Sequence, residues 1–155
     1  MPTKDGISDA DWKCVTDRAL DLLEHLDGPD EGAYRRRLLD YLSQLEERYG
    51  RLPSILAARA DLGGDTHAHD RESLLVESFA LYETTSDHQG MLYTAHSLAE
   101  FYVDDLWHRE KAAFWIGRLE NLLINSDESW LREEPLRLRN ELHSARVRRR
   151  GCVTG

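Results

Sequence analysis

Apolar residues recur at intervals of three and four along most of the chain, the spacing that places side chains on one face of an α-helix. The first such stretch begins near Ser8, which forms with Asp11 a capping box that carries a carboxylate in place of the usual Glu or Gln. Residues 27–30, which include Gly28 and Pro29, end this first helix. The apolar positions of this first helix are Trp12, Val15, Ala19, Leu22, Leu23 and Leu26.

Glycine and proline residues divide the rest of the chain into further helices. Gly50 ends the second helix after Tyr49, and Pro53 opens the third in its favoured early position. Ser86 and Gln89 form a second capping box. No alternating strand pattern competes, so the sequence predicts an all-α fold with about seven helices. The later ranges are 53–64, 70–84, 87–106, 109–124 and 128–149, the last kinked or restarted at Pro135.

A repeat of 36 residues relates the helices to one another. Leu20, Leu56 and Leu92 align at this step, and so do Leu26, Leu62 and Leu98. The second helices of the first two pairs match as well, at Leu38 with Leu74, Leu39 with Leu75, and Leu45 with Leu81. In the third pair the spacing is 40, as between Ser86 and Ser126. Four residues are about one helical turn, so an inserted turn near 104–107 keeps the stacking.

These residues resemble a known family. The segment 95–102 followed by Glu110-Lys-Ala-Ala-Phe-Trp115 resembles a tetratricopeptide repeat, and more closely the Sel-one-like subgroup with its Lys-Ala-x-x-Trp element. Leu62-Gly63 and Leu98-Ala99 match the large-then-small pair of such repeats. The resemblance covers residues 53–126 and is faint over 8–50, where Asp27 replaces the small residue. It implies an α-solenoid of antiparallel helix pairs, in which the first helix of each pair lines a concave groove.

The predicted organisation is one helical-repeat domain over residues 8–149. Its helix pairs are 8–50, 53–86 and 87–126, and a capping helix occupies 128–149. Residues 1–7 are expected to form a flexible N-terminus and residues 150–155 a tail. Trp115 is expected to be buried between repeats.

Charge and composition narrow the function classes. A formal net charge of −9 argues against nucleic-acid binding, which needs clustered Lys and Arg. No apolar run approaches the roughly 18 residues of a membrane span, and no signal-peptide pattern precedes Ile7. Cys14 and Cys152 are far apart and suggest no disulfide. We expect a soluble cytoplasmic protein without a cofactor.

The most suggestive chemical motif is His67-Ala-His69-Asp70. Two histidines at this spacing can hold a metal, and a His-Asp pair is typical of all-helical metal phosphohydrolases, but a site needs further ligands that no spacing supplies. We interpret the motif as a polar loop with Asp70 as a helix N-cap. No catalytic residue and no metal ligand are predicted, and an all-helical metal hydrolase remains an alternative.

The expected groove is acidic. Six positions on the first helices of the pairs are predicted to bind a partner, and the other interpretation of them is a solvated helix face. The leading hypothesis is an adaptor or chaperone that binds a basic protein or peptide, with an immunity protein that neutralises a basic toxin as the alternative. The oligomeric state is not predicted. The six positions are Asp21, Glu24, Tyr93, His96, Glu100 and Asp104.

Overall fold

The computed structural model describes residues 5–64, 68–105 and 108–151. This part of the chain is all-helical, as predicted, and contains seven α-helices and no strand. A π-helix and a 3-10 helix separate some of them. The elements are α1 Asp9–Glu24, α2 Glu31–Tyr49, α3 Pro53–Leu62, α4 Ala68–Thr84, α5 His88–Glu100, η1 Phe101–Asp105, α6 Arg109–Leu123, η2 Ser129–Leu131 and α7 Glu134–Gly151.

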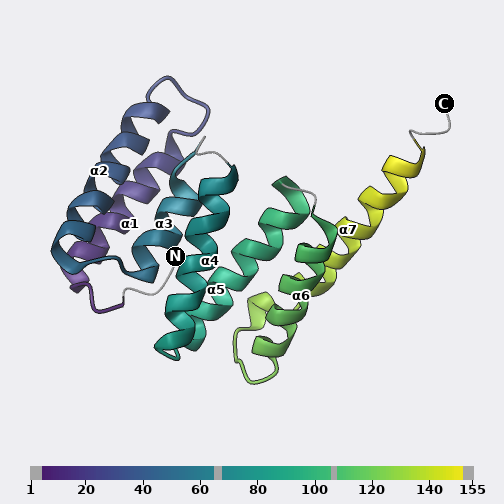
Figure 1. Cartoon of the computed structure of the whole chain (residues 1–155). Helices are drawn as coiled ribbons and strands as arrows, with labels where there is room; N and C mark the ends of the chain where they lie inside the picture. The colour runs from purple at the N-terminus through teal and green to yellow at the C-terminus, as the bar shows by residue number, and fades with distance from the viewer. Residues whose placement is uncertain (1–4, 65–67, 106–107, 152–155) are drawn as a thin grey trace. The chain divides into compact units, whose positions relative to one another are not determined.

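The chain forms two compact units, Met1–Gly90 and Met91–Gly155, called unit 1 and unit 2 below. In unit 1, α1 packs against α2, α2 against α3, and α3 against α4; Figure 1 shows these helices side by side. Their facing apolar stripes make the core, in which the buried residues include Val15, Leu38 and Ile55. The predicted helix pairs and the single domain spanning 8–149 stay predictions.

Helix ends in unit 1 follow the local signals in the sequence. The Ser8 hydroxyl accepts a hydrogen bond from the Asp11 backbone N–H at 3.1 Å and donates to Asp11 Oδ2 at 3.0 Å, so Ser8 is confirmed as the N-cap of α1. The Ser8 backbone N–H donates to the Tyr49 hydroxyl at 3.4 Å and not to Asp11, so the other half of the predicted capping box is wrong. Gly50 follows α2 with a φ of 87°, a conformation that glycine adopts without strain. Pro53 is the first residue of α3.

The N-terminal segment is more ordered than predicted from residue 5 onward. Ile7 is 2% exposed and belongs to the core of unit 1. The Asp5 carboxylate accepts a hydrogen bond from the Ser54 backbone N–H at 3.0 Å, which satisfies an N–H group in the first turn of α3. Residues 5–7 are therefore part of the packed unit, and residues 1–4 lie outside the described residues.

The predicted apolar face of the first helix includes residues that the structure leaves exposed. Leu22 is 1% exposed, but Leu23 is 51% and Leu26 is 46% exposed. Leu26 lies beyond the end of α1 at Glu24, so it no longer shares the helical face of Leu22. Leu20 is also exposed, at 52%. Their counterparts in the 36-residue alignment are less exposed: Leu56, Leu92 and Leu98 are buried, and Leu62 is half-buried.

The predicted fifth helix differs at both ends. Its N-terminus is capped by Asp87 rather than Ser86, because Asp87 Oδ1 accepts a hydrogen bond from the Gly90 N–H at 2.9 Å. Its α-helical part ends at Glu100 instead of Leu106, and η1 continues it as a π-helix. The sequence predicted an inserted helical turn near residues 104–107. The first two residues of that segment, Asp104 and Asp105, belong to the π-helix η1, whose turn is wider than that of an α-helix. Such turns are frequent at functional sites.

Unit 2 is built around α6. This helix packs against α7 and η1, and α7 also contacts η1 and η2. Trp115 is buried at 9% exposure, near the fully buried Ile116 and Leu119, and its predicted place between repeats stays a prediction. Pro135 is the second residue of α7 and marks a restart after η2, since proline is tolerated in the first helical turn. The α7 backbone stays helical to Gly151, two residues past the predicted end.

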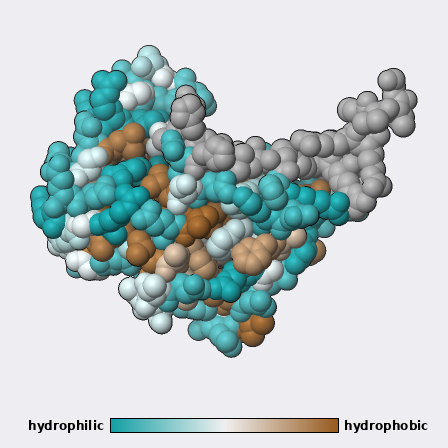
Figure 2. All heavy atoms as spheres, viewed as in Figure 1, coloured by the Kyte–Doolittle hydropathy of each residue, from teal (hydrophilic) through white to brown (hydrophobic). Residues whose placement is uncertain are grey.

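The surface is mainly hydrophilic, in keeping with a mean hydropathy of −0.60. On the face in Figure 2, hydrophobic residues form separate patches among hydrophilic ones. Among the described residues, no helix has the combined length and apolar character of a membrane span.

Candidate functional site

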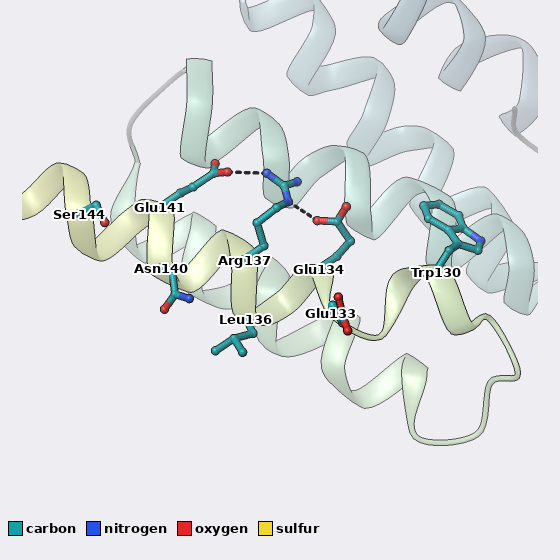
Figure 3. Close-up of a pocket in the computed structure, with 8 residues that line it drawn as sticks. All are labelled: Trp130, Glu133, Glu134, Leu136, Arg137, Asn140, Glu141 and Ser144. Carbon is teal, nitrogen blue, oxygen red and sulfur yellow. Dashed lines mark hydrogen bonds and ion pairs between the residues drawn. The ribbon is translucent and has the colours of Figure 1, made fainter.

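One face of α7 carries charged residues at helical spacing. Glu134, Arg137 and Glu141 are separated by three and four residues, so their side chains project on the same side of the helix. Figure 3 shows Arg137 between the two glutamates. These residues belong to an open cleft of about 660 Å³, called the acidic cleft below. It is lined by Trp130, Glu133, Glu134, Leu136, Arg137, Asn140, Glu141 and Ser144.

Three carboxylates hold the Arg137 guanidinium. Its Nη2 donates to Glu100 Oε1 at 2.7 Å, its Nη1 donates to Glu141 Oε1 at 2.6 Å, and its Nε donates to Glu134 Oε2. The planar guanidinium has donors pointing in several directions, so one arginine can engage several carboxylates at once. Glu100 comes from α5, so this network ties α5 to α7 within unit 2.

His96 lies beside the same carboxylates. Its Nε2 is 3.5 Å from Glu100 Oε1 and 3.7 Å from Glu134 Oε1. This nitrogen is inaccessible to solvent and has no hydrogen-bond partner. The ring meets the Trp130 indole edge-on, with centroids 5.8 Å apart. Trp130 is 59% exposed, and its Nε1–H donates to Glu128 at 2.8 Å.

Negative charge exceeds positive charge around Arg137. Loss of hydration raises the pKa of the Asp104 carboxyl above its usual value, and repulsion from Glu141, a hydrogen bond with Glu141 and repulsion from Glu100 raise it further. Arg137 opposes this rise without cancelling it. Four carboxyl groups lie around one guanidinium: Glu100, Glu134 and Glu141 contact Arg137, and Asp104 lies near enough for its charge to be felt.

The same cluster includes a set of atoms with metal-binding geometry. Ligand atoms of His96, Glu100 and Glu134 lie within 4.8 Å of one another. Arg137 engages both glutamates, so a metal ion would have to displace a guanidinium that already supplies positive charge. The predicted loop motif His67-Ala-His69-Asp70 lies largely outside the described part of the chain, which includes neither His67 nor the side chain of His69.

Of the six residues predicted to bind a partner, three meet at this cluster. His96 and Glu100 are neighbours on α5, and Asp104 follows in η1. Tyr93 is half-buried on α5, one turn before His96. The remaining two, Asp21 and Glu24, are exposed on α1 in unit 1. The structure describes each unit by itself, so a groove shared by all six stays a prediction.

The sequence reasoning missed the contribution of α7. Glu134, Arg137 and Glu141 supply most of the cluster, and Trp130 supplies its aromatic edge. Their spacing was a visible signal, since a Glu-Arg-Glu series at three and four residues marks one charged helix face. The spacing alone could not show that Arg137 on this face contacts Glu100 of α5.

Comparisons with protein-family models, with curated proteins and with solved structures found no match to this chain.

Proposed function

We propose that this chain is a protein-interaction module, an adaptor or chaperone, whose acidic cleft binds a basic protein or peptide. The observation that carries the proposal is the uncompensated negative charge. Glu100, Glu134 and Glu141 share the single guanidinium of Arg137. Loss of hydration, together with repulsion from Glu141 and Glu100, raises the pKa of Asp104 even though Arg137 stands nearby. A lysine or arginine from a partner would relieve this repulsion on binding.

The way in which the cleft holds Arg137 supports a guanidinium or ammonium as the bound group. Charge-assisted hydrogen bonds from arginine to carboxylates are strong and directional. The Glu133 side chain is exposed at the cleft and has no hydrogen bond or ion pair among the described residues, so its carboxylate is available to an incoming cation. Trp130 adds an exposed indole on which a cation can rest. No catalytic role is proposed for these groups.

The proposal includes the tetratricopeptide-like architecture. In such an array Asp21 and Glu24 would lie on the first helix of the first pair, which lines the concave groove. A basic toxin is the second candidate partner, because an immunity protein neutralises such a toxin through the same excess of carboxylates.

The test is the association rate of a fluorescent nona-arginine peptide as a function of ionic strength. Glu133→Lys leaves the contacts of Arg137 intact and reverses one charge in the cleft. We expect it to slow association and to weaken affinity on the order of fivefold, with a flatter salt dependence. Glu47→Lys, an exposed residue of α2 with the same charge change, is the matched control.

Glu24→Lys tests the groove separately. An effect as large as that of Glu133→Lys would support one acidic surface over both units. Equal small effects of all three substitutions would refute a specific site in the cleft, because peptide binding would then follow net charge alone.

A further inference from the structure

An apolar groove adjoins the acidic cleft on α7. It has a volume of about 420 Å³. Leu136 lines both the groove and the acidic cleft, so the two surfaces are continuous through this side chain. Figure 3 shows Leu136 on the opposite side of α7 from Glu134 and Glu141. The residues that line the apolar groove are Glu120, Leu123, Ile124, Arg132, Pro135, Leu136 and Arg139.

The exposed hydrophobic residues of unit 2 gather at these two surfaces. Ile124 is 76%, Leu136 64% and Trp130 59% exposed, and each lines one or both of them. Within the described part of unit 2, Phe114 is the one other large hydrophobic residue that is exposed. Single exposed leucines are ordinary, but large apolar side chains grouped beside a charged cleft are typical of a binding surface.

We infer that the partner segment is amphipathic: a lysine or arginine enters the acidic cleft while an adjacent leucine-like side chain packs on Leu136 and Ile124. This inference rests on the proposed function and adds the apolar half of the recognition. Charge complementarity fixes the place of the basic residue, and the continuity through Leu136 places the apolar residue next to it. Such an apolar anchor beside a polar rim is the usual composition of an interface.

The polar rim of the groove sets a further requirement on the partner. Arg139 Nε donates to Glu120 Oε1 at 2.7 Å, so this pair is internally satisfied. Arg132 is exposed and has no ion pair among the described residues. A second basic residue at this end of the segment would therefore meet an unpaired positive charge. The segment carries its basic residue at one end only, on the side of Glu133.

The experiment compares three synthetic twelve-residue peptides by fluorescence anisotropy. The first carries one arginine near one end with a leucine next to it, the second replaces this leucine by glycine, and the third replaces the arginine by glutamate. We expect the leucine–arginine peptide to bind on the order of tenfold more tightly than the glycine–arginine peptide. Leu136→Gln should remove this difference, whereas Leu23→Gln, at an exposed leucine of α1, should keep it.

The outcomes separate this inference from the proposed function. Equal affinity for the first two peptides, with both weakened by Glu133→Lys, would overturn the apolar anchor and leave the acidic cleft as the binding site. Equal affinity for the leucine–glutamate peptide would overturn the charge-based proposal itself. Sedimentation supplies the remaining check, because a dimer that Leu136→Gln dissociates would show that a second copy of the chain covers the groove.

Discussion

Replacement of Arg137 by glutamine removes the cation from the centre of the carboxylate cluster. Glutamine keeps the side chain as far as Cδ and removes the charge-assisted contacts with Glu100, Glu134 and Glu141. The Arg137 side chain is 41% exposed, so each contact is screened by water and contributes about 0.2–1 kcal/mol. The three contacts share one guanidinium, which gives a total loss of about 1–2 kcal/mol at pH 7. For a chain of this size that corresponds to a decrease in melting temperature of roughly 2–8 °C.

Urea unfolding at 50 and 500 mM NaCl measures this effect and its origin. The loss should be smaller at the higher salt concentration, because ions screen both the lost attraction and the repulsion among the remaining carboxylates. Arg139→Gln is the control, since Arg139 makes one exposed contact with Glu120 and should lose under about 0.5 kcal/mol. A loss no larger than in this control, or one that does not depend on salt, would refute the assigned role of Arg137.

Three further substitutions test other features of the structure. Asp104→Asn should stabilise the protein at pH 7: the raised pKa of Asp104 means that its ionised form disfavours folding above the usual pKa of 3.8, so the gain should vanish in urea titrations below that pH. Gly90→Ala should destabilise it by about 1–3 kcal/mol in the same assay, because the new Cβ would lie 2.2 Å from the buried Tyr82 ring; an unchanged midpoint would contradict the packing. Ser78→Ala should cost about 1 kcal/mol, since the buried Ser78 hydroxyl donates to the Pro53 carbonyl at 2.8 Å, and an unchanged midpoint on urea unfolding would argue against that bond.

The parts of the fold that the sequence predicted are those set by nearby residues. Ser8, Gly50 and Pro53 act within one helical turn, so helix ends could be located from them. The fifth helix shows where such signals are ambiguous. Ser86 and Asp87 are adjacent and both suit an N-cap, but Ser86 has a φ of 54° and Asp87 makes the bond.

The parts that could not be predicted depend on contacts distant in sequence. Asp5 reaches Ser54 across 49 positions, and no local pattern marks that pair. The candidate site is of the same kind. His96, Glu100 and Asp104 were selected from the helix pattern alone, but Arg137 lies 37 residues beyond Glu100 and joins them through tertiary packing.

The most direct measurement of the central claim is an NMR titration of the isotope-labelled protein with nona-arginine. The side chain of Trp130 supplies a separate indole N–H signal, which Trp130→Phe identifies. We predict saturable shifts largest at this indole and at the backbone amides of Glu133 and Glu141, and their reduction in Glu133→Lys. Shifts confined to unit 1, or small shifts spread evenly over all acidic residues, would contradict a specific cation-binding cleft on α7.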